Sequence, residues 1–132
     1  MHLIVCIDDR DGMHFGGRRL SSDCTLTEYI LNLASAAKLW MNAYSAKLFP
    51  ADAVCIAEDF LLQAGEGEYC FVETTALTEK LSLESVTLCR WNRRYPFTEV
   101  FPRELLKGMH LAHSQDIPGN SHDTITIERY IP

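Results

Sequence analysis

The feature that most constrains the fold of this chain is a series of short apolar runs that do not alternate with polar residues. The clearest runs are residues 3–7, 53–57 and 69–72. A strand with one face in water alternates apolar and polar side chains, whereas a strand buried on both faces is apolar throughout. The runs therefore predict strands of a sheet that is covered by helices on both faces.

Segments with helical signals separate these strands. Residues 25–28 (Thr-Leu-Thr-Glu) fit a capping box, in which the Thr hydroxyl and the Glu carboxylate satisfy free amides at a helix start. Two more strands are expected at residues 38–42 and 86–91, and three shorter helices at residues 45–50, 58–63 and 75–81. Because helices alternate with strands, right-handed crossovers are expected to align the strands in parallel.

The C-terminal third follows a different pattern. Residues 124–130 alternate apolar and polar side chains with a period of two, and a turn cluster at residues 118–120 follows a strand expected at residues 109–114. This pattern predicts an antiparallel hairpin with one face in water. The sequence thus predicts a single α/β domain over residues 1–132, with a mostly parallel central sheet, helices on both faces and a C-terminal antiparallel hairpin.

Charge and cysteine content narrow the classes of function. The chain has 18 acidic and 12 basic side chains and a net charge of −6, which disfavours nucleic acid and anionic membranes as partners. Its five cysteines include no Cys-x-x-Cys pair, so buried free thiols in a reducing compartment are expected. No apolar run is long enough to span a bilayer, and no signal-peptide pattern is present. We expect a cytoplasmic protein with a small-molecule ligand, and a homo-oligomer is left open.

The order of these features resembles the dihydrofolate reductase fold over nearly the whole chain. An apolar strand is followed by Gly12-Met13, by an acid at the start of the first helix (Asp23), and later by a Thr-x-x-Phe-Pro segment at residues 98–102 and a final hairpin. The resemblance implies a shortened reductase scaffold with a ligand pocket. In that family the acid corresponding to Asp23 protonates or hydrogen-bonds the substrate ring, so Asp23 is the candidate catalytic residue. The alternative for Asp23 is a helix cap.

Several positions depart from the family's pattern. The glycine pair that lets the family's backbone approach the cofactor pyrophosphate is replaced by Glu73 and Thr74. A carboxylate there would repel phosphate, so NADPH is possible as a cofactor but disfavoured. Asn42 and Ala43 replace a Gly-Arg pair at the start of the second helix. The resemblance therefore implies a degenerate scaffold rather than an ordinary reductase.

Four further residues are candidates for ligand binding. Arg18 and Arg19 follow two glycines and could hold a carboxylate or phosphate bidentately. The alternative is that both arginines are solvated and balance the charge of nearby acidic side chains. If their loop folds over the pocket, as the resemblance implies, both would face Asp23 and keep it ionised. Ser45 stands where the family has Thr at a helix start. Cys89 stands where the family has a Thr that supports the acid, and the alternative for Cys89 is a buried structural thiol.

No metal site is expected. Small bacterial chains similar to this one carry the label ribonuclease Z, whose chemistry needs a His-x-His-x-Asp-His cluster, but the five histidines here include no His-x-His. His110 and His113 are three apart on a predicted strand, so they should point to opposite faces. His122 lies in the predicted turn and is expected to be solvated.

Three functions follow as hypotheses. The first is a small-molecule-binding domain for an anionic, nucleotide-like or pterin-like ligand, with a pocket around Arg18, Arg19, Asp23, Ser45 and Cys89. The second is an NADPH-dependent reductase of a pterin- or pyrimidine-like substrate. The third is a non-catalytic protein-interaction domain whose pocket is vestigial. The replaced glycines count against the second hypothesis, and the retained acid counts against the third.

Overall fold

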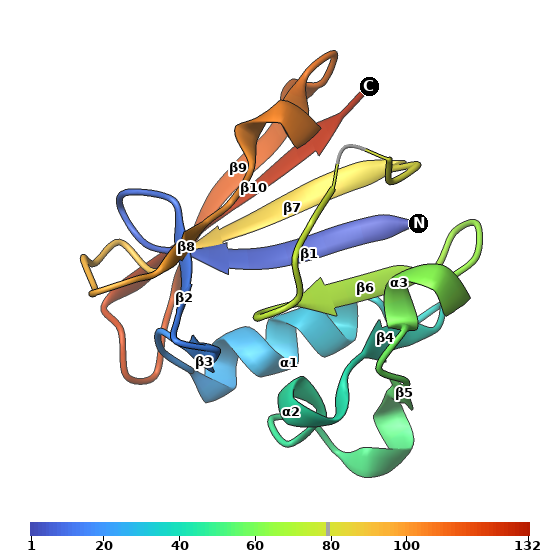
Figure 1. The fold of residues 1–132 in the computed structure, drawn as a ribbon. Helices are drawn as coiled ribbons and strands as arrows, with labels where there is room; N and C mark the ends of the chain where they lie inside the picture. Colours follow the sequence, from blue (N-terminus) through green and yellow to red (C-terminus); the bar gives the residue numbers. More distant parts are fainter. Residues whose placement is uncertain (79) are drawn as a thin grey trace.

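Seven strands form a central sheet in the order β5-β4-β6-β1-β7-β10-β9 (Figure 1). In the computed structural model, which describes residues 1–78 and 80–132, these strands are β1 (His2–Ile7), β4 (Leu39–Met41), β5 (Cys55–Ile56), β6 (Tyr69–Val72), β7 (Ser85–Arg90), β9 (His110–Pro118) and β10 (Thr124–Ile131). The first five are parallel, whereas β10 runs antiparallel to both β7 and β9. The α/β class with a mostly parallel sheet and a C-terminal antiparallel pair is therefore confirmed.

The central strand β1 is buried on both faces, as its continuous apolar sequence predicts. Ile4 and Cys6 lie in one apolar core, and Leu3, Val5 and Ile7 lie in the other. Leu3, Ile4, Val5 and Ile7 are fully buried. Each such side chain contributes about 1.5–3 kcal/mol of transfer free energy, so an alternating polar strand would not be stable at this position.

Helices cover the two faces unequally. The helices and helical turns are α1 (Cys24–Leu33), α2 (Ala43–Ala46), η1 (Ala51–Ala53), α3 (Phe60–Gln63) and η2 (Arg103–Leu106). Leu26 and Ile30 of α1 pack on the face that holds Ile4. Phe60 of α3 and Leu105 of η2 pack on the opposite face.

After β1 and after β6, the chain continues on opposite faces of the sheet. After β1 it passes to α1 on one face, and after β6 it passes through residues 73–84, whose Leu77 and Leu83 pack on the other. Figure 1 shows this second segment crossing in front of β1 on its way to β7. Adjacent parallel strands whose connections diverge in this way leave a crevice at their carboxyl ends, where α/β folds bind ligands. The fold therefore places the candidate site beyond the ends of β1 and β6.

The helix expected at residues 75–81 is wrong for the part of it that the structure describes, and residue 79 lies outside that part. Residues 75–78 and 80–81 form bends, a turn and irregular chain. Leu77 and Leu83 both contact the same face of the sheet. Residues six apart point to different sides of a helix, so a helix would not place both side chains on the same face of the sheet.

The stretch between β1 and α1, for which no strand was expected, contains one. β2 (Gly12–Phe15) pairs with β3 (Arg18–Arg19) and with β8 (Glu99–Val100), and together they form a second, three-stranded sheet. Gly16 and Gly17 join β2 to β3 with φ of 55° and 80°, a conformation that glycine adopts at low cost. This hairpin carries Arg19 toward the end of β6.

The expected helix starts are also corrected. Asp23 rather than Thr25 caps α1, and its carboxylate accepts hydrogen bonds from the backbone amides of Thr25 and Leu26. Asn42 rather than Ser45 caps α2, and it accepts from the Ser45 amide. Asp and Asn are among the strongest N-cap residues, which explains both outcomes. Across the part of the chain that the structure describes, no helix combines the length and apolarity that a membrane crossing requires.

Candidate functional site

A buried ion pair occupies the crevice between β1 and β6. Glu73 directly follows β6, and the residue is only 6% exposed. The Arg19 guanidinium donates from Nε to Oε2 at 2.9 Å and from Nη2 to Oε1 at 3.1 Å. The Ser45 hydroxyl donates to Oε1 at 2.8 Å. The carboxylate is thus held by a bidentate guanidinium and one hydroxyl, which is the strongest form of this pairing.

The Arg19 side chain lies flat against a tyrosine. Its guanidinium carbon is 4.3 Å from the centre of the Tyr44 ring, its Nη2 donates to the Tyr44 carbonyl, and its backbone amide donates to the Tyr44 hydroxyl. Burial alone would lower the pKa of Arg19, but the hydrogen bond and the charge of Glu73 raise it. The guanidinium therefore stays charged, and its Nε, its Nη2 and one of its faces make contacts within the chain.

Two cysteines lie beneath this ion pair. Cys6 and Cys89 are register neighbours on β1 and β7, and Cys89 is fully buried. A hydrogen bond with Cys89, burial and the charge of Glu73 raise the pKa of Cys6 well above its usual value. Cys6 is therefore a thiol rather than a thiolate, and it does not supply a nucleophile at neutral pH.

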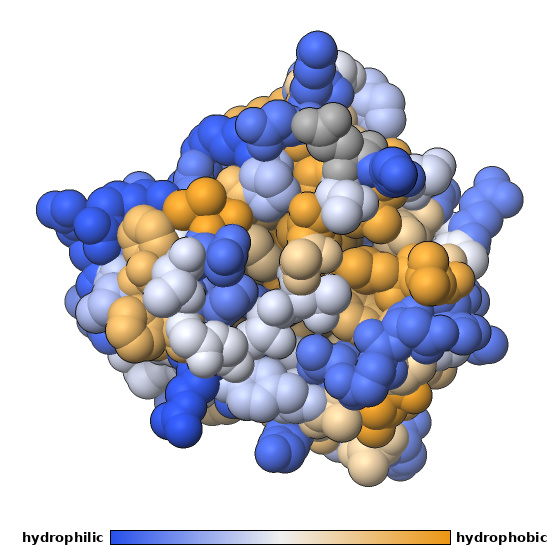
Figure 2. Space-filling view, in the orientation of Figure 1, coloured by the Kyte–Doolittle hydropathy of each residue, from blue (hydrophilic) through white to orange (hydrophobic). Residues whose placement is uncertain are grey.

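A pocket of about 360 Å³ opens beside the ion pair. It lies between the small sheet and the segment that follows β6, and its lining residues are Met13, His14, Thr74, Thr75, Ala76, Leu77, Glu99, Val100 and Pro102. Neither Arg19 nor Glu73 lines this pocket, but two of its lining residues are their neighbours, since His14 is the register partner of Arg19 and Thr74 follows Glu73. Figure 2 shows this side of the molecule, where apolar surface is framed by hydrophilic side chains.

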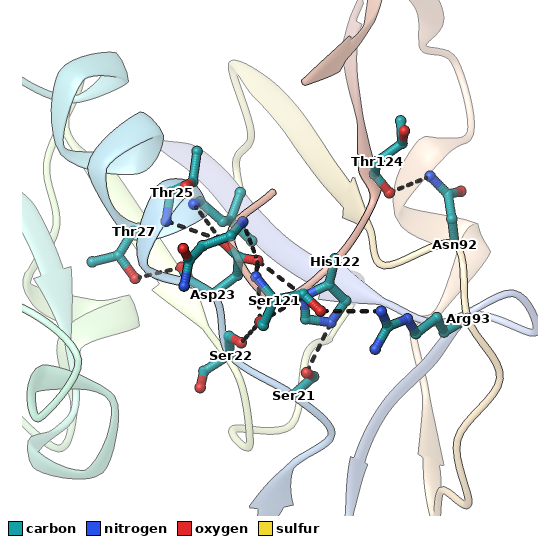
Figure 3. A network of polar contacts seen from close by, with 12 residues as sticks. Ser21, Ser22, Asp23, Thr25, Thr27, Asn92, Arg93, Ser121, His122 and Thr124 are labelled. Carbon is teal, nitrogen blue, oxygen red and sulfur yellow. Dashed lines mark hydrogen bonds and ion pairs between the residues drawn. The ribbon is translucent and has the colours of Figure 1, made fainter. Parts of the chain in front are cut away.

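A second polar cluster joins the start of α1 to the β9–β10 turn (Figure 3). Besides the two helix amides, the Asp23 carboxylate accepts hydrogen bonds from the backbone amides of Asn120 and Ser121 and from the Ser121 hydroxyl. His122 Nδ1 lies 3.0 Å from Asp23 Oδ2. Burial alone would raise the pKa of Asp23, but hydrogen bonds from Asn120, His122 and Ser121 together hold it far below its usual value.

The expectation of a solvated His122 is wrong. The residue is only 3% exposed, and its ring stacks on Trp91 with centroids 4.6 Å apart. Its Nε2 lies 3.0 Å from the Ser21 hydroxyl and 3.2 Å from the Tyr95 hydroxyl. The ring is drawn inward because both nitrogens find partners there, which offsets the loss of hydration.

The structure divides the predicted site residues between these two clusters. Arg19 and Ser45 meet at Glu73, and Cys89 lies beneath them through its contact with Cys6. Asp23 belongs to the other cluster, so the expectation that Arg19 faces Asp23 is wrong: Arg19 pairs with Glu73 instead. Arg18 is exposed. The roles proposed for these residues stay predictions.

Two central residues were not among the predicted site residues. Glu73 carried a signal, since an acid directly after a buried parallel strand lies at the edge where such sheets bind ligands. His122 carried none, because its partners are about a hundred residues away in the sequence. Within residues 1–78 and 80–132, no group of three or more His, Cys, Asp or Glu side chains is placed to hold a metal ion.

Comparisons with known proteins establish the fold. No family model and no curated protein matches this chain. Among solved structures, it is similar to dihydrofolate reductase from Enterococcus faecalis complexed with NADP(H) and RAB-propyl, with a TM-score of 0.69 and 9% sequence identity. The match covers 98% of this chain and 94% of that one. At this identity the likeness shows the fold alone, and the chain has a dihydrofolate-reductase-like fold.

Proposed function

We propose that this chain is a small-molecule-binding domain whose ligand site is the crevice beyond β1 and β6, with Glu73 as the anchoring group. The observation that carries the proposal is the bidentate pair between Glu73 and Arg19. A carboxylate that is almost fully buried requires a partner that satisfies both of its oxygens. In the present structure a side chain of the same molecule supplies that partner.

Of the two partners, Arg19 is the replaceable one. The Glu73 side chain is 5% exposed and follows a central strand, whereas the Arg19 side chain is 22% exposed and belongs to the two-residue strand β3. Gly16 and Gly17 directly precede β3, and their backbone provides a hinge about which β3 can carry Arg19 away from Glu73. A ligand can therefore displace the guanidinium without disturbing the central sheet.

The chemistry of the displaced group defines the ligand class. A guanidinium presents two parallel N–H donors on a flat frame, and a 2-aminopyrimidine edge presents the same pattern when its ring nitrogen carries a proton, as in the N–H and 2-amino edge of a pterin or in protonated 2,4-diaminopyrimidine. Such a ring would take the two Glu73 oxygens and stack on Tyr44 as Arg19 does. The adjoining pocket of about 360 Å³ provides room for the rest of a small ligand, near the lower end of the usual range of about 300–1,000 Å³.

Anionic ligands and the reductase hypothesis have less support. An anionic ligand would have to compete with Glu73 for a guanidinium that is already paired. A reductase would have to place cofactor phosphates near the same carboxylate, which repels them. We therefore expect a pterin-like ligand rather than an anionic one.

Thermal unfolding with 2,4-diaminopyrimidine as the probe tests the proposal. Arg19→Ala leaves Glu73 buried without its counter-charge, which costs about 3 kcal/mol. For a chain of this length that loss lowers Tm by about 10 °C. The probe should recover a large part of the loss in Arg19→Ala and should raise Tm less in the wild-type protein, where it must displace Arg19.

Matched variants decide the outcome. Arg18→Ala removes an exposed neighbouring arginine and should respond as the wild-type protein does. Glu73→Gln should abolish the response to the probe. An equal response in Glu73→Gln, or no response in Arg19→Ala, would contradict the proposal. Inorganic phosphate is the opposing probe: stabilisation of the wild-type protein that Arg19→Ala removes would instead make Arg19 the anchor of an anion site.

A further inference from the structure

The cluster around His122 contains a serine, a histidine and an aspartate in a continuous relay (Figure 3). His122 Nδ1 lies 3.0 Å from Asp23 Oδ2, and His122 Nε2 lies 3.0 Å from Ser21 Oγ. A nucleophile, its base and a group that orients the base need mutual distances of about 2.6–3.2 Å. The distances between the three side chains therefore match those of a serine hydroxyl that is activated by an oriented histidine base.

The partners of His122 fix its tautomer. Asp23 is held as a carboxylate by the backbone amides of Asn120 and Ser121, so it accepts the proton that Nδ1 carries. Nε2 is then the acceptor nitrogen, and the Ser21 hydroxyl lies nearest to it, at 3.0 Å. Stacking on Trp91, with the two ring planes 27° apart, holds the imidazole in this orientation. The base is thus oriented from one side and aimed at the hydroxyl on the other.

Ser21 is placed to meet a reagent from solution. It is half-buried, in contrast to His122 and Asp23, which are almost fully buried. It precedes the first residue of α1 by three positions, close to the partial positive charge of the helix N-terminus. A half-buried hydroxyl next to a buried base is the arrangement that serves nucleophilic catalysis.

We propose that Ser21 is a nucleophile for acyl transfer, with His122 as its general base and Asp23 as the positioning carboxylate. This activity is independent of the ligand site at Glu73. Ser21 Oγ attacks the carbonyl carbon of a small activated ester while its proton passes to His122 Nε2. The C–O bond to the leaving alcohol breaks, and the alcohol takes that proton. Water then attacks the acyl-serine by the same path and releases the acid.

A second hydroxyl shares the base. Tyr95 Oη lies 3.2 Å from the same Nε2, slightly farther than Ser21 Oγ. Tyr95 is therefore the alternative acyl acceptor, and peptide mapping separates the two. Acetyl on Tyr95 instead of Ser21 would overturn the assignment of Ser21.

The test is reaction with p-nitrophenyl acetate, followed by nitrophenolate release and by mass spectrometry of the peptides. The wild-type protein should carry one acetyl group on Ser21, and Ser21→Ala should lose it. His122→Gln removes the base and should slow acetylation at least ~100-fold. Ser22→Ala is the matched control, because the Ser22 side chain lies outside the relay, and it should react as the wild-type protein does.

Each result bears on the proposal. If His122→Gln fails to fold by circular dichroism, Ser21→Ala and Ser21→Cys still decide the question: alanine should abolish nitrophenolate release and cysteine should restore acylation. Acetyl groups only on lysines or the N-terminus, or an unchanged rate in Ser21→Ala, would overturn the proposal.

Discussion

Asp23 should be the most sensitive polar position in the fold, and Asp23→Asn tests this. Its carboxylate accepts hydrogen bonds from Thr25, Leu26, Asn120, Ser121 and His122. Asparagine is as good an N-cap as aspartate, so the cap itself is kept. Each backbone amide of the β9–β10 turn that loses its charged acceptor costs about 1–3 kcal/mol, and two such amides are involved. Because asparagine keeps one carbonyl oxygen, we expect a total near the lower end, about 2 kcal/mol.

The same interactions set a pH dependence. Hydrogen bonds from Asn120, His122 and Ser121 lower the pKa of folded Asp23 despite its burial, so the folded protein binds fewer protons at this site than the unfolded chain. The stabilisation is therefore complete above the unfolded pKa of about 3.9, and it is lost as the pH falls through the lower folded pKa. The difference between the wild-type protein and Asp23→Asn should be constant from neutral pH to about 5 and should shrink in stronger acid.

Urea unfolding at pH 7, at pH 5 and below about pH 3 measures both effects, with circular dichroism as the signal. Asp123→Asn is the control, since Asp123 is an exposed aspartate of the same turn, and it should stay within about 0.5 kcal/mol of the wild-type protein. A loss below about 1 kcal/mol for Asp23→Asn, or a loss equal to that of the control, would refute the role given to this carboxylate.

Two further predictions concern the turn and the cofactor. Gly119→Ala should destabilise the protein by about 1–3 kcal/mol in urea, because a Cβ there would lie 2.9 Å from Asp23 Oδ2 and still closer to the His122 carbonyl. Gly65→Ala, whose nearest neighbour atom is 3.6 Å away, is its control, and equal losses would contradict the prediction. Titration with NADPH should give no saturable energy transfer from the two tryptophans up to millimolar concentration, because the side chains of Glu73 and Thr74 hinder the close backbone approach that a pyrophosphate needs; micromolar binding would revive the reductase hypothesis.

The sequence predicts those parts of the fold that one local pattern determines. Unbroken apolarity predicted β1 and β6 with both faces buried, and the period of two predicted β10 in the C-terminal hairpin. These patterns suffice because burial of each residue follows from its own strand geometry. The order of the elements, taken together, then pointed to the dihydrofolate-reductase-like fold that the structural comparison confirms.

Features that depend on distant partners were not predictable in the same way. The capping box placed the start of α1 at Thr25 and left Asp23 as an alternative cap, and no local pattern indicated that Asp23 also binds a turn about a hundred residues away. The segment after β6 has a composition that suits a helix, but Leu77 and Leu83 both pack against one face of the sheet. For that segment, tertiary contacts outweigh a local propensity that is worth less than about 1 kcal/mol per residue.

The pair at the crevice shows why single positions misled the prediction of the site. Judged alone, Glu73 repels phosphate and Arg19 attracts an anion, so the two residues suggest opposite ligands. Judged together, each satisfies the other, since either charge left alone at this depth would cost several kcal/mol. The two residues therefore have to be interpreted as a unit, and on the function proposed above a flat, donor-bearing ligand would take the place of Arg19 on Glu73.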